Sequence, residues 1–338
     1  MAYSVFEYED VFHLESGESF PDLKIAYHTF GNLSSDSKIV WVCHNLTANS
    51  DPTDWWSGIF GEGKLFNPDE YFIICANIIG SPYGSTSPLS INTFNNCKWF
   101  RDFPLVSIRD MVRAHILLAD YLSINNIDYL IGASIGGFQA IEWSIMDADR
   151  IKNLILIASS VRASPWLIAS NTSQRLSIES DSSFYEDIET GGLIGLKAAR
   201  SIALLTYRCS SKYNSSQLES DDSKLSDFKA DSYQRYQGDK LVKRFNAFSY
   251  YCLTRTLDTH NISRNRNSFE RVLSDINANS LIVGISSDIL FPIEEQLFIA
   301  ENIDNAVYRQ INTDSGHDGF LIEVECLRKI IKDFIDGK

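Results

Sequence analysis

The sequence predicts an α/β fold in which a mostly parallel, doubly wound sheet is interrupted by an inserted helical cap. Short, continuous apolar segments alternate with helical segments from the start of the chain to about residue 160. Between about residues 164 and 271 helical patterns replace these segments, and strand character returns at Ser280–Ile285. We therefore expect residues 1–163 and 272–338 to form one core, with residues 164–271 inserted as the cap.

The expected core strands are apolar segments without polar alternation, which suits strands buried on both faces of a parallel sheet. These strands are Ile39–Cys43, Tyr71–Ala76, Tyr129–Gly132 and Leu154–Ala158. Core helices are expected at Ser107–Leu122, Phe138–Met146 and Leu321–Ile335. Ser107 and Asp110 have the spacing of an N-terminal capping pair. In the cap we expect helices at Leu193–Tyr207 and Lys240–Leu257, and a flexible loop at Ser210–Asp231.

Composition excludes several classes of protein. The 338 residues are 44% hydrophobic and 22% charged, which is typical of a globular chain. Thirty basic against 44 acidic residues give a net charge of −14, which disfavours nucleic-acid and anionic-membrane partners but not a small anionic substrate. The N-terminus is acidic and no apolar run could span a membrane, so a cytoplasmic location is expected. The six scattered cysteines predict reduced thiols and no metal site.

The chemically most informative segment is Gly132-Ala133-Ser134-Ile135-Gly136, which lies between a predicted strand and a predicted helix. In this position a G-x-S-x-G sequence forms a sharp turn that exposes the serine hydroxyl as a nucleophile. The alternative is a glycine-rich turn without chemistry, and we favour the nucleophile because of the strand–turn–helix context.

A serine nucleophile needs a base, and the base needs an acid that orients it. In this architecture the acid and then the histidine follow the serine along the chain. His317, in a glycine-flanked loop before the last helix, is the better base, whereas His260 is interpreted as a polar surface residue. Asp288, directly after the strand at Ser280–Ile285, is the expected acid. The oxyanion requires two backbone amides, one from Ile135 and one from the loop 44–49, where His44 is expected to be structural.

At this point the sequence resembles the homoserine O-acyltransferase (homoserine O-acetyltransferase) family, enzymes of methionine biosynthesis with the α/β-hydrolase fold. The resemblance rests on motifs from both the core and the cap. They are CHNLTAN, GSTSP, FPLVSIRDMV, GASIGGFQAIEW, GLKAARSIALLTYR, YQGDKLVKRFNAFSYYCLTRTLD, SSDILFP and GHDGF. The cap motifs separate this family from esterases that share only the triad.

The resemblance assigns a role to each matching residue. It implies a triad of Ser134, Asp288 and His317, with oxyanion donors on the backbones of Leu46 and Ile135. It also implies that three further residues bind the amino-acid acceptor: Arg200 its carboxylate, with Tyr207 nearby, and Asp318 its ammonium group. The chain departs from the family at Ala48, where relatives commonly have glycine, and it is shorter between Glu179 and Gly191.

The family's reaction is a ping-pong transfer of an acyl group, here expected to be acetyl, from acyl-CoA to the side-chain hydroxyl of L-homoserine. The resemblance implies no permanent cofactor and no metal, with acetyl-CoA as co-substrate, and a homodimer formed through the cap. Three alternatives stay open at this stage. They are the same mechanism with L-serine or succinyl-CoA, an esterase that uses water, and a non-catalytic binding protein.

Overall fold

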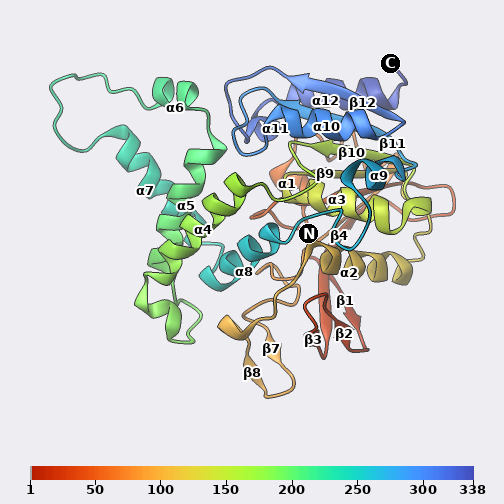
Figure 1. Ribbon diagram of the computed structural model, residues 1–338, viewed down its shortest axis with the longest axis horizontal. Coiled ribbons are helices and arrows are strands. Elements are labelled where there is room, and N and C mark those ends of the chain that lie inside the picture. Colours follow the sequence, from red (N-terminus) through yellow and green to blue (C-terminus); the bar gives the residue numbers. More distant parts are fainter. Residues whose placement is uncertain (1) are drawn as a thin grey trace.

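The computed structural model describes residues 2–338, and its centre is an eight-stranded sheet in the order β1-β4-β6-β5-β9-β10-β11-β12 (Figure 1). The strands, in that order, are Ser4–Tyr8, Leu23–Phe30, Tyr71–Ala76, Lys38–Cys43, Tyr129–Ala133, Asn153–Ile157, Asn279–Ile285 and Ala306–Ile311. β4 pairs antiparallel with both β1 and β6, and the other neighbouring pairs are parallel. The predicted mostly parallel sheet is confirmed.

Burial on both faces explains the continuous apolar strands. In β5, Ile39, Trp41 and Cys43 belong to the apolar layer on one face, and Val40 and Val42 belong to the layer on the other. The first layer also takes in α2 (Ile108–Tyr121), α3 (Ile135–Met146), α9 (Phe269–Ser274) and α10 (Ile293–Asn302). The second takes in α12 (Val324–Ile335), with Trp56 and Phe320. Each strand residue therefore contributes buried apolar area whichever way its side chain points.

The start of α2 shows how local sequence sets an element boundary. Ser107 Oγ accepts a hydrogen bond from the amide of Asp110, and Asp110 Oδ2 accepts one from the amide of Ser107. This reciprocal pair satisfies two amide groups that have no partner inside the helix. The predicted capping pair is confirmed.

The cap consists of α4 (Pro165–Glu179), α5 (Leu193–Tyr207), α6 (Ser210–Ser216), α7 (Lys229–Val242) and α8 (Ala247–Asp258). All five follow β10 and precede β11 in the chain, and in Figure 1 they extend as green and cyan helices to one side of the core. Within the cap, α5 packs against both α4 and α7. The borders predicted for the cap at residues 164 and 271 stay a prediction.

Three predicted elements were wrong in detail. The single helix expected at Lys240–Leu257 is broken at residues 243–246, because Asn246 accepts a hydrogen bond from the amide of Ser249 and starts a new helix. The loop expected at Ser210–Asp231 contains α6 and the start of α7. The last predicted helix is divided into α11 (Gly319–Ile322) and α12.

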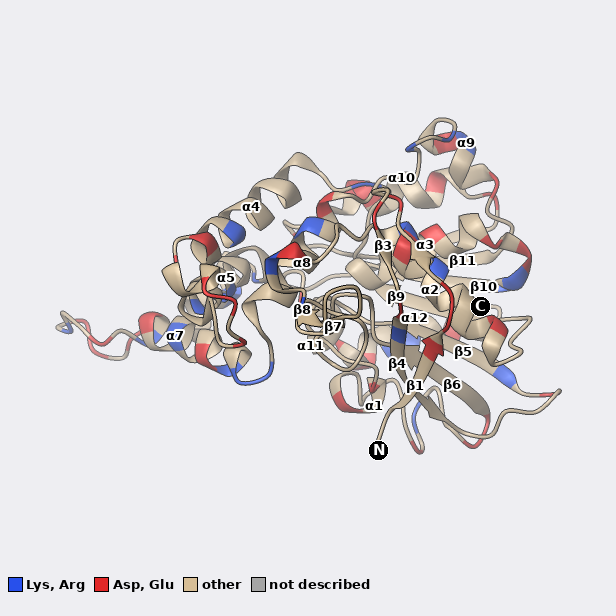
Figure 2. Cartoon of the chain, turned by 90° about the horizontal axis from the view of Figure 1, so that it is seen from below, with Lys and Arg blue, Asp and Glu red and all other residues tan. Residues whose placement is uncertain are grey.

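The remaining elements are short. They are α1 (Pro52–Trp55), the hairpins β2 (Phe12–His13) with β3 (Ser19–Phe20) and β7 (Ile91–Asn92) with β8 (Cys97–Lys98), and 3-10 turns at Phe100–Asp102, Ala148–Arg150 and Ser182–Tyr185. Figure 2 shows acidic and basic residues interspersed over core and cap. Among residues 2–338, no helix is long and apolar enough to cross a bilayer.

Candidate active site

The turn that carries Ser134 is sharp and closely packed. Ser134 directly follows β9 with φ +56° and ψ −126°, and α3 begins at the next residue. A Cβ on Gly132 would lie 2.1 Å from the carbonyl oxygen of Gly136, and a Cβ on Gly136 would lie 2.1 Å from that of Cys43. Side chains are therefore excluded at both glycines. A non-glycine residue in the left-handed region at the start of a helix fits the nucleophile interpretation.

Asp288 and His317 come together although 29 residues separate them in the chain. His317 Nδ1 donates to Asp288 Oδ2 at 2.7 Å, and Asp288 Oδ1 accepts from the amides of Leu290 at 2.8 Å and Phe291 at 3.0 Å. Both residues are buried. The carboxylate thus fixes the imidazole tautomer that leaves Nε2 free to accept a proton.

Electrostatics favour a basic imidazole at this position. Burial alone would lower the pKa of His317, but the Asp288 charge, its hydrogen bond and the charge of Asp318 raise it, and the net shift is upward. The rings of Phe291, Phe320 and Tyr207 surround the imidazole at centroid distances of 5.2, 5.5 and 5.8 Å. Within residues 2–338, the Ser134 hydroxyl is not hydrogen-bonded to His317. Catalytic contacts of this kind commonly tighten only when substrate binds.

The loop 44–49, called here the oxyanion loop, follows β5 and lies beside the start of α3. The carbonyl of Asn45 accepts from His44 Nδ1 at 2.8 Å and from the amide of Ala48 at 3.2 Å. Since the C=O and N–H groups of a trans peptide point in opposite directions, these bonds also orient the amide of Leu46. In the part of the chain that the structure describes, neither Leu46 nor Ile135 donates its amide to a protein acceptor. Both amides are therefore free to bind an anion.

Gln139 and His44 connect this loop to its surroundings. Gln139 Nε2 lies 3.3 Å from the carbonyl of His44 and 3.2 Å from that of Ile135, so one side chain connects the start of the oxyanion loop to the first residue of α3. His44 Nε2 accepts from the amide of Ile78 at 3.1 Å, and burial lowers the pKa of His44 to about 4. This neutral, fully engaged imidazole has the structural role predicted for it. Ala48 is outside the positive-φ region, so its side chain causes no backbone strain.

The three residues expected to bind the acceptor lie at one junction between the cap and the core. The Arg200 guanidinium lies 5.6 Å from the centroid of the Tyr207 ring, which is itself next to His317. The amide of Asp318 donates to the carbonyl of Tyr207 at 3.2 Å. Burial raises the pKa of Tyr207, while Arg200 lowers it and Asp318 raises it, and the net shift is upward. The phenol is therefore neutral at physiological pH.

Arg208 is a residue of this junction that was not predicted from the sequence. Its Nη2 lies 3.1 Å from Asp318 Oδ2, so the proposed ammonium-binding carboxylate already has one cationic neighbour. Its position next to Tyr207 in the LLTYR motif was the available signal.

The prediction that His260 is a polar surface residue was wrong, because its side chain is buried. Its ring stacks on Phe138 at 3.8 Å, and its Nε2 is 2.9 Å from the carbonyl of Ser160.

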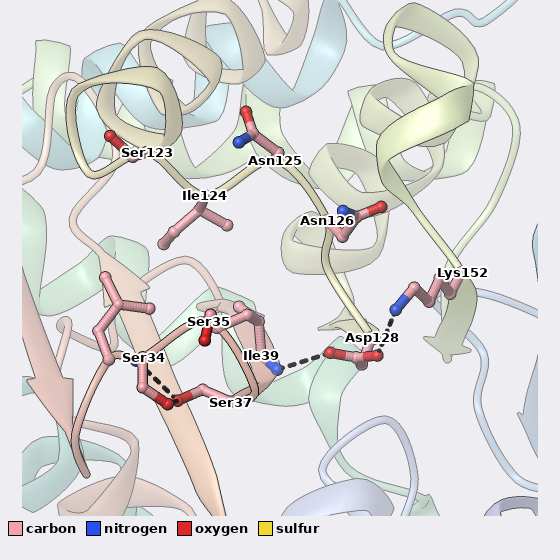
Figure 3. A pocket seen from close by; sticks show the side chains of 11 residues that line it. Ser34, Ser35, Ser37, Ile39, Ser123, Ile124, Asn125, Asn126, Asp128 and Lys152 are labelled. Carbon is pink, nitrogen blue, oxygen red and sulfur yellow. Dashed lines mark hydrogen bonds and ion pairs between the residues drawn. The ribbon is translucent and has the colours of Figure 1, made fainter.

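The cavity shown in Figure 3 lies at the opposite ends of the strands. Its volume is about 250 Å³, and it is lined by residues at or just before the amino-terminal ends of strands, including Ile39, Asp128 and Lys152. The amide of Ile39 and Lys152 Nζ both donate to the Asp128 carboxylate, at 2.8 and 2.9 Å. Ligands of open α/β sheets bind at the carboxyl ends of the strands, where Ser134 and Asp288 lie. No three His, Cys, Asp or Glu side chains within residues 2–338 are placed to hold a metal ion.

Comparison with known proteins separates the families that share this geometry. The sequence pattern of the alpha/beta hydrolase fold matches residues 38–324. A homoserine O-acetyltransferase of Cyclobacterium marinum is 42% identical over 335 residues, which cover 99% of this chain and 95% of the relative. The chain belongs to the homoserine O-acetyltransferase family. The predicted resemblance and fold class are thereby confirmed, and the chain is a member of a family of transferases.

Solved structures of this family and of esterases share the fold. The homoserine O-acetyltransferase of Staphylococcus aureus has a TM-score of 0.83 at 29% identity, with 99% of this chain and 95% of that chain covered. Esterase E22 has a TM-score of 0.87 at 21% identity, with 98% and 99% covered. Because an esterase superposes as well as a family member does, the fold alone does not distinguish transfer from hydrolysis.

Proposed function

We propose that this protein transfers an acetyl group from acetyl-CoA to the side-chain hydroxyl of L-homoserine, in methionine biosynthesis. The observation that carries the proposal is the junction at which Arg200, Tyr207 and Asp318 meet His317. It provides a cation and an anion for the two charged groups of an amino acid beside the proposed general base. An enzyme that uses water as acceptor has no need of such a pair.

The proposed first half-reaction acylates Ser134. His317 Nε2 accepts the proton of the Ser134 hydroxyl while Oγ attacks the thioester carbonyl carbon. The negative charge that develops on the carbonyl oxygen is held by the amides of Leu46 and Ile135 and by the N-terminal end of α3. When the tetrahedral intermediate collapses, the C–S bond breaks and His317 returns the proton to the CoA thiolate. The product is acetyl-Ser134 and free CoA.

The second half-reaction repeats these steps with homoserine. Its hydroxyl gives a proton to His317 and attacks the acetyl carbon, the C–O bond to Ser134 breaks, and Ser134 regains the proton. Asp288 stabilises the imidazolium in both steps. In this proposal Arg200 and Asp318 hold the acceptor by its carboxylate and ammonium groups. Transfer outruns hydrolysis only when the acceptor is held in place more effectively than water is.

The test is release of free thiol from acetyl-CoA and from succinyl-CoA, each with homoserine, serine or no acceptor, beside a Ser134→Ala control. Release from acetyl-CoA that requires homoserine and is abolished in the control supports the proposal. Preference for serine or succinyl-CoA would keep the mechanism and change the substrates. Equal release without acceptor would make the protein a hydrolase, and no release with any pair would favour a binding protein.

We also propose a homodimer formed through the cap. Large apolar side chains are exposed on cap helices, among them Trp166 and Leu176 on α4 and Ile194 and Leu205 on α5. Exposed apolar side chains gathered on one part of a protein favour association. Light scattering on the purified protein tests this proposal, with a dimer mass expected for the wild type and a monomer for Ile194→Glu combined with Leu205→Glu.

A further inference from the structure

One side chain of the cap, Arg244, reaches the oxyanion loop. Arg244 lies in the short connection between α7 and α8. Its Nη1 donates to the carbonyl oxygen of Thr47 and, at 2.7 Å, to the hydroxyl of Tyr83, and its Nη2 lies 3.3 Å from Thr47 Oγ1. Thr47 directly follows Leu46, whose amide is a proposed oxyanion donor. The cap thus contacts the loop one residue away from that donor.

The two ends of the loop are held by the core, whereas Thr47 near its middle is not. Gln139 Nε2 lies 3.3 Å from the carbonyl of His44, and the carbonyl of Asn49 accepts from Trp55 Nε1 at 2.9 Å. Within residues 2–338, Arg244 is the only hydrogen-bond donor to the carbonyl of Thr47. The carboxyl-terminal half of the Asn45–Ala48 turn therefore depends on a contact from the cap.

Arg244 is itself placed by well-anchored neighbours. Phe245 is buried, its ring lies 5.8 Å from that of Tyr83, and Asn246 caps α8. The carbonyl of Tyr83 accepts from Asn77 Nδ2 at 2.8 Å. Because the donors of a guanidinium lie in one plane, an arginine whose backbone is anchored in this way and that donates to several oxygens forms a rigid connection. Arg244 is exposed overall, so this contact lies at the edge of the site rather than in the core.

We propose that Arg244 is a positioning residue that holds the oxyanion loop in its anion-binding conformation and so couples the cap to both half-reactions. The proposal rests on the oxyanion role proposed for Leu46. A four-residue turn has few backbone states, so a bond to the peptide after Thr47 limits the orientation of the amide at Leu46. Without Arg244 the turn can adopt other backbone conformations. The amide of Leu46 then points at the anion for only part of the time.

Loss of the Arg244 contact should destabilise the transition state without weakening substrate binding. The tetrahedral intermediates of acylation and deacylation share the same oxyanion donors, so both steps slow together. Loss of one donor typically costs about 10²–10³-fold in kcat. Because Arg244→Met loosens a donor without removing it, we expect a loss of about 10- to 100-fold. The KM for homoserine should stay within about 2-fold, since Arg244 is not part of the Arg200–Asp318 junction.

The experiment compares p-nitrophenyl acetate with acetyl-CoA as acyl donors for the wild type, Arg244→Met and Arg244→Lys. The ester has neither CoA nor acceptor, so its rate of Ser134 acylation reports on the proposed triad and oxyanion hole without a contribution from binding of CoA or homoserine. We expect Arg244→Met to lower kcat/KM for both donors by the same factor, and Arg244→Lys to recover part of it. Arg235→Gln is the matched control, because it removes an exposed arginine of the cap that pairs with Asp231 on its own helix. It should leave both rates unchanged.

Two outcomes would overturn the proposal. Unchanged acylation by p-nitrophenyl acetate in Arg244→Met would show that the loop keeps its conformation without the contact. A loss confined to the KM for acetyl-CoA would make Arg244 a binding residue for that donor. If Arg244→Met does not fold, Arg244→Gln takes its place, and a wild-type acylation rate in this shorter variant would overturn the proposal equally. Should the wild type fail to acylate homoserine, the ester assay still tests the positioning role separately from the proposed function.

Discussion

Asp318 and Arg208 form an ion pair of 3.1 Å at the point where the loop of His317, the proposed general base, meets the end of α5. The loop and the helix are in close contact there, because a Cβ on Gly316 would lie 2.6 Å from the amide nitrogen of Cys209. Arg208 binds Asp318 Oδ2, and this ion pair fixes the direction in which the other carboxylate oxygen points. The proposed ammonium site is thereby set by a residue of the cap.

Arg208→Gln should raise the KM for homoserine by about 5-fold, because Asp318 loses the partner that orients it and a partly exposed pair contributes only modestly. Acylation of Ser134 should be unchanged. Steady-state kinetics with varied homoserine measures the KM, and a single-turnover assay measures the rate of Ser134 acylation separately. Arg328→Gln, which breaks an exposed pair with Glu325 on α12, is the matched control. A fall in the acylation rate of Arg208→Gln would assign the arginine to the general base instead.

Arg200→Ala should raise the KM for homoserine more than Arg208→Gln does. Removal of the only carboxylate partner proposed for the acceptor should raise the KM for homoserine by about 10- to 100-fold, since a charge-assisted bidentate contact is lost. The burst of CoA release on acylation should persist. Equal loss of both half-reactions in stopped-flow measurements would remove Arg200 from the acceptor site.

Gly136→Ala should destabilise the protein and inactivate it. The added Cβ would lie 2.1 Å from the carbonyl oxygen of Cys43, so α3 must move away from the end of β5, and the two proposed oxyanion donors separate. Overpacking of this kind costs about 1–3 kcal/mol, and we expect a loss of about 100-fold or more in kcat. Gly337→Ala adds a Cβ where nothing lies within 4 Å, but at a φ of +71°, so it is a control for activity and not for stability. Urea unfolding and the thiol-release assay measure both effects, and full activity of Gly136→Ala would contradict the packing argument.

The sequence predicted the parts of this structure that depend on local pattern. Continuous apolar strands and the Ser134 turn were visible because burial on both faces and a sharp strand-to-helix turn each impose residue types over a few positions. The antiparallel strands β1 and β4 escaped notice, since Leu23–Phe30 includes exposed and polar positions and has no such pattern. The break before Asn246 was also missed, although an asparagine cap was a usable signal.

Features made by tertiary contact were not accessible in the same way. His260 has polar neighbours in the chain, and only its stacking on Phe138 reveals that it is buried. Arg244 and Thr47 are 197 residues apart, so no spacing rule connects them. The residues proposed to bind the acceptor were predicted through family resemblance alone, because an isolated arginine in a helix is usually a solvated side chain. Their meeting at His317 is a property of the fold.

The pH dependence of acylation should follow His317. The base must be neutral to accept the proton of Ser134, and its pKa is raised above the ordinary value of about 6.5, so kcat/KM for acetyl-CoA should fall as the pH drops, with a midpoint above about 6.5. Asp288→Asn removes the charge that raises this pKa and the group that fixes the tautomer. We expect the midpoint to move to lower pH and kcat to fall by about 10⁴-fold. An unchanged midpoint in Asp288→Asn would show that another group controls the profile.

Stability should also decline towards low pH, through His115. His115 is fully buried among Trp41 and Trp143, and within the described residues neither of its ring nitrogens has a hydrogen-bond partner. Burial, with a contribution from His44, lowers its pKa to about 3. The unfolded chain therefore binds a proton below about pH 6.5 that the folded protein does not, and stability is lost as the pH falls from about 6.5 towards 3.

His115→Leu tests this account, because it replaces the imidazole with an apolar side chain of similar size. Removal of two unpartnered polar atoms should leave the free energy of unfolding at pH 7.5 unchanged or raise it by about 1 kcal/mol. Between pH 6.5 and 5.5 the free energy of unfolding of the variant should fall by up to about 1.4 kcal/mol less than that of the wild type. This is the largest change that binding of one extra proton by the unfolded chain produces over one pH unit. Urea unfolding at the three pH values measures both quantities. His13→Leu, at an exposed histidine on β2, is the control and should keep the wild-type slope, whereas an equal slope in His115→Leu would show that His115 does not contribute to the acid sensitivity.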